Sequence, residues 1–254
     1  MPLTHMRPRL IGIGVGPGDP DLITVKAISA LCAADAILVP ATEASGDGPG
    51  RAEQIVVAAA PEVAHVIVRV PFSMADRSGV TERRREAWQT SADAALAAYA
   101  RGARTVAFAT VGDPSVYSTF SYLAAYVADR VADLEIEVVP GITAMQALAA
   151  ESRTPLVEGT ETLALVPVTA GLDVLGRVLD TVDTVVAYKG GRRMPEVAGQ
   201  LRERGRDAVV GVNVGLERQE LFGLDRLEAD RKVGYFSTVI IPARRDGQET
   251  GGRL

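Results

Sequence analysis

The sequence predicts an α/β protein of two lobes, with a mostly parallel sheet in the N-terminal lobe and a mixed sheet in the C-terminal lobe. Short apolar runs typical of strands alternate with helical patterns through the first half of the chain. Such alternation implies parallel strands joined by helical crossovers. In the second half, the runs at residues 208–214 and 219–222 are separated by a short connection, which favours an antiparallel pair.

Each element of the N-terminal lobe follows from a local pattern. Strands are expected where apolar runs are short, and helices where apolar residues recur at helical spacing. The strands are expected at residues 10–15, 36–40, 63–70, 105–109 and 135–139, and the helices at 21–33, 51–60, 79–101 and 115–129. Residues 42–50 form a polar, glycine-rich loop that is long enough to reach over a binding site.

The C-terminal lobe is expected to begin near residue 143, so that residues 1–142 form one domain and residues 143–254 form another. Its strands are expected at 162–168, 184–188, 208–214, 219–222 and 236–242, and its helices at 172–179 and 195–204. A chain of 254 residues is long enough to bury a core in each of two such domains.

The composition argues against several classes of function. His5 and His65 are the only histidines, so we expect neither a bound metal nor a Ser-His-Asp triad. Cys32 is the only cysteine, and its neighbours place it on the expected buried face of a helix. The net charge of −5 argues against binding to nucleic acid. Since the chain shows no membrane-spanning run and no signal segment, we expect a cytoplasmic protein.

Two turns at the ends of predicted strands mark a candidate ligand site. The first is GIGVGPGD at residues 12–19, and the second is VGDPSVYSTF at residues 111–120. Ligands of open α/β sheets bind at the carboxyl ends of strands, where glycines allow a close approach. Pro17 stands at the last glycine of the dinucleotide fingerprint and supplies no N–H to a phosphate. The turns therefore predict a site for a small molecule without phosphate, and the alternative for the first turn is a tight connection that binds nothing.

Three segments of the chain resemble, in the expected order, the signatures of the tetrapyrrole (corrin/porphyrin) methylases. They are GVGPGDPDLITVKA at residues 14–27, GDP at residues 112–114 and VPGITA at residues 139–144. The segment YSTFSYL at residues 117–123 further resembles the branch of the family that methylates precorrin-2 at C20. The resemblance covers about residues 10–242 and implies a tetrapyrrole-methylase-like fold.

The resemblance also implies a cofactor and the residues that hold it. Members of the family are usually homodimers that bind S-adenosyl-L-methionine in a cleft between the two lobes, with the tetrapyrrole in an adjoining trough, and release S-adenosyl-L-homocysteine. Lys189 stands where the family usually has methionine, which puts a side-chain contact there in doubt. Matched by motif, the expected cofactor-binding residues are Pro17, Val111, Gly112, Asp113, Val116, Thr143, Ala144, Lys189, Val214 and Thr238.

Two of these residues have an alternative role. Asp113 could accept hydrogen bonds from the amine or ribose of the cofactor, or it could only cap the helix that is expected to begin near Ser115. Thr143 has the same alternative, because threonine is also a common helix cap.

The implied reaction is methylation of precorrin-2 or cobalt-precorrin-2 at C20 in cobalamin biosynthesis. Tyr117 and Tyr122 are the candidates for catalytic residues, although an ordinary tyrosine pKa near ~10 favours packing against the macrocycle over proton removal. Arg192 and Arg193 are expected to bind substrate carboxylates, and the run Arg83–Arg85 is interpreted as a solvated helix face or a weaker candidate for that role. The alternatives are another tetrapyrrole methylase, such as uroporphyrinogen III C-methyltransferase, and a regulator that binds the cofactor without turnover.

Overall fold

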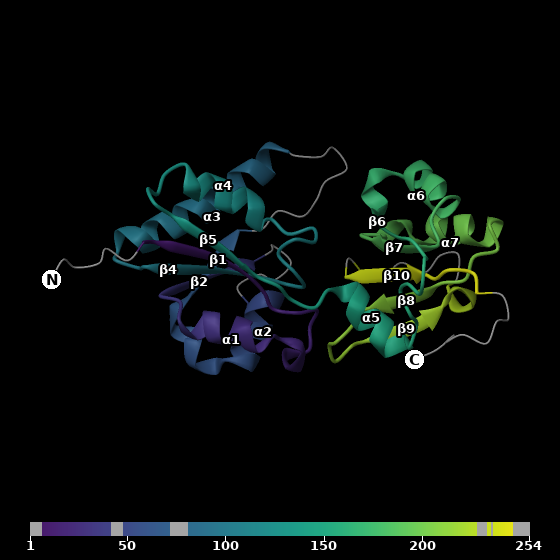
Figure 1. Cartoon of the computed structure of the whole chain (residues 1–254), viewed down its shortest axis with the longest axis horizontal. Helices are drawn as coiled ribbons and strands as arrows, with labels where there is room; N and C mark the ends of the chain where they lie inside the picture. Colours follow the sequence, from purple (N-terminus) through teal and green to yellow (C-terminus); the bar gives the residue numbers. More distant parts are fainter. Residues whose placement is uncertain (1–6, 42–47, 72–80, 228–232, 235, 246–254) are drawn as a thin grey trace. The chain divides into compact units, whose positions relative to one another are not determined.

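The structure is a computed structural model that describes residues 7–41, 48–71, 81–227, 233–234 and 236–245, and only the backbone of Arg192 (Figure 1). The chain divides into two compact units after Thr143. The first unit contains a five-stranded parallel sheet, and the second contains a five-stranded mixed sheet. The predicted α/β class, with a parallel sheet followed by a mixed one, is confirmed.

The first sheet has the strand order β3-β2-β4-β1-β5. All of its neighbouring strands pair in parallel. Because parallel strands point the same way, the turns that follow all five strands lie at one edge of the sheet. The strands are β1 (Arg9–Gly14), β2 (Ala36–Ala41), β3 (Ile67–Pro71), β4 (Thr105–Thr110) and β5 (Glu135–Val139).

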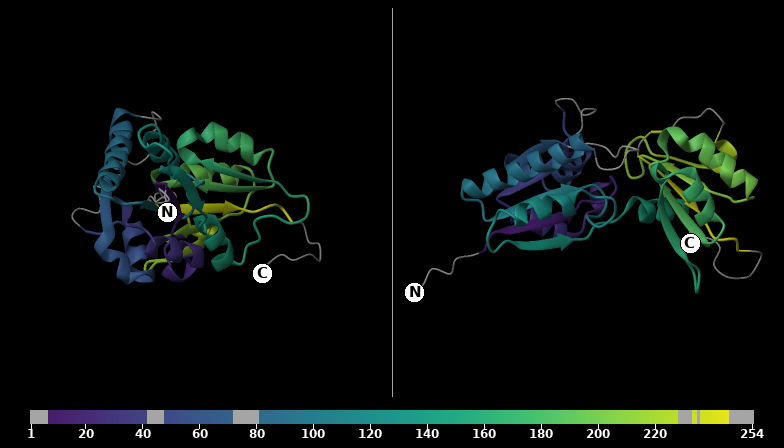
Figure 2. Two further views of the ribbon diagram at one scale, coloured as in Figure 1. Left: turned by 60° about the vertical axis from the view of Figure 1, so that its left-hand side comes forward. Right: turned by 90° about the horizontal axis from the view of Figure 1, so that it is seen from above.

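Helices cover both faces of the first sheet, as Figures 1 and 2 show. One face packs against α1 and α2 through a core that includes Ile37 and Ile55. The other face packs against α3 and α4 through a core that includes Phe108 and Leu123. The helices are α1 (Val25–Cys32), α2 (Arg51–Ala59), α3 (Glu82–Ala100) and α4 (Phe120–Ala128).

The second sheet has the strand order β6-β7-β10-β8-β9. β6 runs parallel to β7, whereas β10 is antiparallel to both β7 and β8, and β9 is antiparallel to β8. The antiparallel pair predicted from the short connection is therefore present. The strands are β6 (Leu163–Pro167), β7 (Thr184–Tyr188), β8 (Val209–Val212), β9 (Glu220–Gly223) and β10 (Ser237–Ile241).

Helices also lie on both faces of the second sheet. α6 and α7 share a core with Val210 and Val212 of β8. Gly211, between these valines, points to the other face, where a Cβ would lie 2.6 Å from the Cδ1 atom of Leu148 in α5. α5 therefore packs closely on the backbone of β8. The helices are α5 (Ala144–Ser152), α6 (Leu172–Leu179) and α7 (Met194–Glu203).

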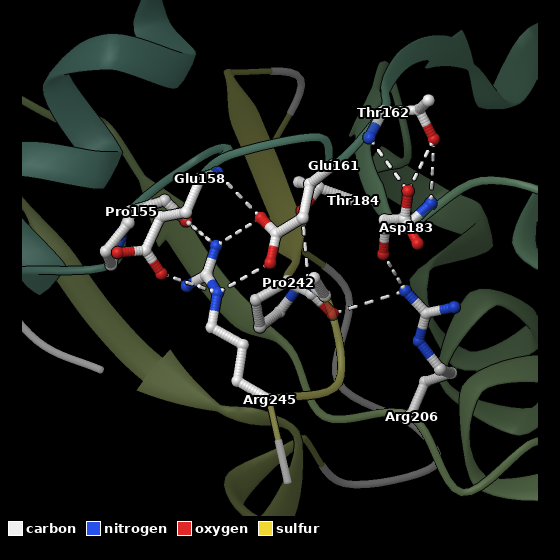
Figure 3. A network of polar contacts seen from close by, with 10 residues as sticks. Pro155, Glu158, Glu161, Thr162, Asp183, Thr184, Arg206, Pro242 and Arg245 are labelled. Atoms are coloured by element: carbon white, nitrogen blue, oxygen red, sulfur yellow. Dashed lines mark hydrogen bonds and ion pairs between the residues drawn. The ribbon is translucent and has the colours of Figure 1, made fainter. Parts of the chain in front are cut away.

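A buried arginine joins three segments of the second unit, and Figure 3 shows its contacts with Asp183 and Pro242. Arg206 is 9% exposed, and its Nη1 atom donates to the carbonyl of Leu179 at the end of α6, at 3.0 Å. Its Nη2 atom donates to the carbonyl of Asp183 and, at 3.2 Å, to that of Pro242. One guanidinium thus satisfies carbonyl groups at the end of a helix and beside two strands.

A second arginine in Figure 3 holds the segment between α5 and β6. Nε of Arg245 lies 2.8 Å from an oxygen of Glu158, and its Nη2 lies 2.6 Å from Glu161. The hydrogen bonds from Arg245 hold the pKa of Glu161 below its usual value. The stretch that connects α5 to the sheet is therefore fixed by ion pairs, not by apolar packing alone.

Several elements begin later in the chain than the sequence indicated. The helix expected at 21–33 divides into a 3-10 helix (Pro20–Leu22) and α1, because the hydroxyl of Thr24 caps α1 by accepting a hydrogen bond from the Ala27 N–H. The strand expected at 63–70 begins at Ile67, after a 3-10 helix (Pro61–Val66).

Two further helices of the first unit, α3 and α4, also start later than expected. α3 begins at Glu82, and residues 79–80 of its expected range lie outside the described residues. α4 begins at Phe120 instead of Ser115, because Tyr117 has a φ of +53°, which an α-helix does not contain. Residues 42–47 of the expected loop likewise lie outside the described part.

Two features differ in kind from the sequence expectation. α5 occupies a stretch to which no element had been assigned. Cys32 is exposed, so its expected burial is wrong, and its thiol lies 3.3 Å from a carboxylate oxygen of Glu62 as a donor. The buried face of α1 is formed by Ala27 and Leu31 instead. Within the ranges described above, no helix is long and apolar enough to cross a membrane.

We expect the change Arg206→Ala to lower the free energy of unfolding by about 2–4 kcal/mol, because it leaves buried carbonyl groups without their charged donor. Urea denaturation followed by circular dichroism would measure the change. The control is Arg177→Ala, which removes the same charge from an exposed position on α6 and should alter stability by less than about 0.5 kcal/mol. Equal losses in both variants would contradict the role given to Arg206.

Candidate functional site

Three turns meet at the carboxyl edge of the first sheet. They comprise residues 15–19, 111–119 and 140–143, and they follow β1, β4 and β5, which are neighbours in the sheet. We call these three turns the glycine edge. The Gly16 N–H donates to the Gly112 carbonyl at 3.3 Å, and the Gly112 N–H donates to the Gly16 carbonyl at 2.7 Å. The two turns singled out in the sequence are therefore bonded to each other.

Glycine is required where the three main chains touch. A Cβ atom on Gly14 would lie 2.6 Å from the carbonyl oxygen of Gly112 and 2.6 Å from the nitrogen of Gly141. Gly16 and Gly112 have φ values of +83° and +74°, a region that other residues rarely adopt. The glycines of the sequence motifs are therefore needed, before any ligand is considered, for the turns to pack against one another.

Asp113 links the second turn to the third. Its Oδ1 atom accepts hydrogen bonds from the Ser115 hydroxyl and, at 2.7 Å, from the Ser115 N–H, and its Oδ2 atom accepts one from the Gly141 N–H at 2.9 Å. Burial raises the pKa of Asp113, but the hydrogen bonds from Ser115 and Gly141 outweigh this effect and hold the pKa below its usual value. Asp113 is therefore an ionised brace between turns, and it does not cap α4, which starts at Phe120.

Several amide groups at the glycine edge already donate hydrogen bonds within the protein. The Val15 N–H donates to β4 at 3.0 Å, Gly16 and Gly112 donate to each other, and Gly141 donates to Asp113. A phosphate-binding turn needs several amides directed at its ligand. The arrangement agrees with the interpretation of these turns as unsuited to phosphate, and it favours a ligand that brings its own donors to carbonyl and carboxylate oxygens.

The glycine edge brings together six of the predicted cofactor-binding residues. Pro17 is buried in the first turn, and Val111 and Val116 are half-buried in the second. Thr143 is 7% exposed at the end of the third turn. Gly112 and Asp113, described above, are both buried. The six residues are Pro17, Val111, Gly112, Asp113, Val116 and Thr143.

The two predicted catalytic tyrosines have different surroundings. Tyr117 lies in the second turn and is 41% exposed. Partial burial raises the pKa of its hydroxyl, so Tyr117 is protonated at neutral pH and is a poor base. Tyr122 lies on α4, where its ring stacks on that of Trp88 with the centroids 3.9 Å apart. The surroundings of both residues favour packing and orientation over proton removal.

Three of the remaining predicted cofactor-binding residues share one edge of the second sheet. Thr238, near the start of β10, pairs with Tyr188 at the end of β7 and with Gly211 near the end of β8. Lys189 directly follows β7, and Val214 follows β8 by two residues. Because β10 is antiparallel to both neighbours, its beginning lies beside their ends, which brings these three residues to one edge of the sheet.

The start of α5 reaches the same edge. The Tyr188 hydroxyl accepts a hydrogen bond from the Met145 N–H at 3.2 Å, which places the neighbouring Ala144 near the end of β7. Lys189 has a φ of +59°, an uncommon conformation for a residue with a Cβ atom. Such conformations persist where the surrounding structure holds them, and they are frequent in binding sites.

The predicted substrate-binding arginines follow β7 in a 3-10 helix (Gly191–Arg193). Nε of Arg193 lies 3.5 Å from a carboxylate oxygen of Glu196, and 28% of the Arg193 side chain is exposed. The side chain of Arg192 lies outside the described part of the structure. The two arginines follow Lys189 by three and four residues in the chain. Arg193 is partly engaged by its acidic neighbour Glu196.

Sequence reasoning missed two residues that shape these edges. Ser115 follows Asp113 by two residues, a spacing typical of turns in which a carboxylate bonds the backbone, so this signal was available. The role of Tyr188 had no comparable signal, because it depends on α5, which was not predicted. In the part of the chain that the structure describes, no group of histidine, cysteine and acidic residues could hold a metal ion.

Comparison with known proteins agrees with the sequence motifs. Residues 9–228 match the family model of the Tetrapyrrole (Corrin/Porphyrin) Methylases. A precorrin-2 C(20)-methyltransferase of Sinorhizobium sp is 35% identical over 94% of this chain and 96% of its own length. A cobalt-precorrin-2 C(20)-methyltransferase of Salmonella typhimurium is 30% identical over 93% of this chain and 97% of its own length.

A solved structure shows the same fold at lower identity. The uroporphyrin III C-methyl transferase of Thermus thermophilus is 23% identical, with a TM-score of 0.65 over 92% of this chain and 97% of that one. Its structure in complex with S-adenyl homocysteine gives a TM-score of 0.60 at 21% identity. At this level of identity the likeness establishes the arrangement of strands and helices.

We expect Gly14→Ala to lower the free energy of unfolding of the first unit by about 1–3 kcal/mol, because the added methyl group forces apart main chains that are in contact. Urea denaturation followed by the fluorescence of Trp88, the only tryptophan, would measure it. The control is Gly199→Ala in α7, where a Cβ atom meets no atom within 4 Å and where alanine should stabilise the helix by up to about 1 kcal/mol. A neutral Gly14→Ala variant would refute the proposed packing.

Proposed function

The chain belongs to the tetrapyrrole (corrin/porphyrin) methylases, and we propose that it transfers a methyl group from S-adenosyl-L-methionine to C20 of precorrin-2 or cobalt-precorrin-2. The observation that carries the proposal is the match, at 35% identity over 94% of the chain, to a protein named for this reaction. The segment at residues 117–123 supports the same branch of the family. The reaction would serve cobalamin biosynthesis.

The glycine edge fits the cofactor. S-adenosylmethionine carries an amine and ribose hydroxyls and lacks phosphate, so it suits an edge at which several amides are engaged and the Asp113 carboxylate is an ionised acceptor. A Cβ atom on Gly112 would meet nothing closer than the Thr143 Cα atom at 4.0 Å, which leaves the main chain open to close approach. When bound, the cofactor supplies an electrophilic methyl group. In the first unit it would be held by Pro17, Val111, Gly112, Asp113, Val116 and Thr143.

Residues of the second unit complete the proposed cofactor set. Ala144, Lys189, Val214 and Thr238 lie at one edge of the second sheet, and Ala144 directly follows Thr143 of the glycine edge in the chain. Lys189 would contribute through its backbone, since its φ of +59° fixes the direction of the main chain there. We propose these four residues on the same family motifs as the six residues of the glycine edge.

The contribution of the protein to the reaction would be mainly orientation. Holding two reacting groups in line supplies a large part of the acceleration in such transfers. Tyr117 keeps its proton at neutral pH, because burial raises its pKa, so it can donate a hydrogen bond or pack but cannot readily accept the C20 proton. We therefore assign Tyr117 and Tyr122 to positioning the macrocycle.

Arg192 and Arg193 are proposed to bind carboxylates of the substrate. Precorrin-2 carries several such groups, and guanidinium groups bind them with charge-assisted hydrogen bonds. The contact between Arg193 and Glu196 is long, at 3.5 Å, and joins residues three positions apart, so a substrate carboxylate could replace Glu196 at little cost. We also propose a cytoplasmic location and, as the family resemblance implies, a homodimer; sedimentation at the mass of one chain would contradict the homodimer.

The reaction is tested by anaerobic incubation of the protein with S-adenosylmethionine and precorrin-2, either metal-free or loaded with cobalt. We expect a product heavier by one methyl group, which NMR assigns to C20. Methylation of uroporphyrinogen III at C2 and C7, with no transfer to precorrin-2, would instead indicate uroporphyrinogen-type methylation, and cofactor binding without any transfer would indicate a regulator. The ratio of rates with the two forms of substrate decides which one is natural.

The role of Asp113 is tested by comparing Asp113→Ala with Ser115→Ala. The first change removes both the brace and the proposed contact with the cofactor, whereas the second removes only a bond within the turn. We expect Asp113→Ala to weaken cofactor binding by about 1.5–3 kcal/mol, and Ser115→Ala by less than about 1 kcal/mol. Isothermal titration calorimetry measures both. Equal losses would show that Asp113 acts only through the turn.

A further inference from the structure

An aromatic and cationic stack lies between the two helices on one face of the first sheet. The ring of Trp88 on α3 and that of Tyr122 on α4 are nearly parallel, with an interplanar angle of 3° and centroids 3.9 Å apart. One turn before Trp88, the guanidinium carbon of Arg84 lies 5.2 Å from the centroid of the indole ring. We call these three residues the Trp88 stack.

The Trp88 stack lies toward the edge of the sheet that carries the glycine edge. Trp88 lines a small hollow together with the ends of β2 and β3, which contribute Pro40 and Pro71, and with Thr119 at the start of α4. The turn that holds Asp113 precedes α4 directly. Since all five strands are parallel, their carboxyl ends form a single edge, and the stack stands beside it on the face of α3 and α4.

The three residues of the stack differ in exposure. Residues that only fill a core would all be buried, and here one of the three is exposed. Trp88 is 6% exposed and anchors the stack, whereas Tyr122 keeps 42% of its surface exposed. Arg84 is half-buried, and its neighbours Arg83 and Arg85 are exposed. The run Arg83–Arg85 could have been a solvated helix face. One of its members, Arg84, instead lies against the aromatic ring of Trp88.

This arrangement matches a flat or puckered ring system that carries carboxylates at its rim. An exposed tyrosine ring backed by a second ring offers a rigid apolar surface for a macrocycle, with little loss of side-chain freedom on binding. The guanidinium of Arg84 lies over the indole ring with its Nε atom buried, so its two terminal nitrogens are the ones that would meet a carboxylate. The ring system of a tetrapyrrole thus has a partner in Tyr122, and a rim carboxylate has a partner in Arg84.

We propose that the Trp88 stack is a contact for the tetrapyrrole, in which Tyr122 packs against the ring system, Arg84 binds one rim carboxylate, and Trp88 positions both. The inference rests on the proposed function, since it takes the substrate to be a polycarboxylate tetrapyrrole. It makes Arg84 a specificity-determining residue, additional to the arginines that follow β7.

The fluorescence of Trp88 provides a direct test, because it is the only tryptophan in the chain and lies within the stack. Precorrin-2 is titrated anaerobically into the protein in the presence of S-adenosylhomocysteine, and quenching of the fluorescence gives the Kd. We expect Arg84→Gln to raise this Kd at least about tenfold, because a charge-assisted hydrogen bond is lost. The cofactor Kd, measured by calorimetry, should change less than about twofold.

Arg85→Gln is the matched control, since it removes the same charge from an exposed position next to Arg84. It should change the Kd for precorrin-2 less than about twofold if the attraction is local and not a general effect of net charge. For Tyr122, the change Tyr122→Leu should weaken binding of precorrin-2 several-fold. Tyr122→Phe keeps the ring and should bind precorrin-2 as the unaltered protein does.

Each outcome of the titration has a clear meaning. If Arg84→Gln binds precorrin-2 as well as Arg85→Gln does, the proposal is wrong. If Arg84→Gln or Tyr122→Leu lowers the melting temperature and weakens cofactor and tetrapyrrole alike, the stack only joins α3 to α4, and the proposal is again wrong. If the unaltered protein binds no tetrapyrrole, the proposed function itself is wrong. That result differs from a failure of the present proposal, which shows only in the variants.

Discussion

Direct contact between three main chains is the constraint on which the candidate site depends. At the ends of β4, β1 and β5 the turns approach so closely that a single Cβ atom on Gly14 would collide with two of them. Such contact is possible only because the three strands are neighbours and glycine stands at Gly14 and Gly141, where a Cβ atom would collide with the main chain. The packing then engages the amides of Val15, Gly16, Gly112 and Gly141 within the protein and fixes Asp113 as an ionised acceptor.

The second unit builds its edge by a different route. There the beginning of β10 lies between the ends of β7 and β8, and a tyrosine hydroxyl holds the start of α5. The positions are set by antiparallel pairing and one side-chain hydrogen bond, so they tolerate larger residues such as Thr238 and Val214. This difference explains why glycine motifs are concentrated in the first half of the sequence, whereas the second half matches the family through scattered residues.

The sequence was sufficient for features that depend on neighbouring residues and insufficient for those that depend on distant ones. The strands at 135–139 and 184–188 and the helix at 172–179 have the predicted bounds, because local apolar patterns define them. The delayed start of α4 depends on the left-handed conformation at Tyr117, and the bond from Gly141 to Asp113 depends on β4 and β5 flanking β1, which no local pattern encodes. The glycine motifs predicted where a ligand would approach, but not that Ser115 and Gly141 occupy both oxygens of Asp113.

The charges of the chain bear on how it would hold an anionic substrate. With a net charge of −5, the protein offers no general attraction to a polycarboxylate. Several arginines are also committed elsewhere: Arg69 to Glu53, Arg204 to Asp180 and Arg245 to Glu161. A guanidinium paired with a carboxylate adds little positive potential, so affinity must come from a few groups in short-range contact. A guanidinium placed against an aromatic face meets that need, because the ring limits the motion of the side chain. Local geometry would then select the substrate, and screening by salt would weaken binding less than it weakens long-range attraction.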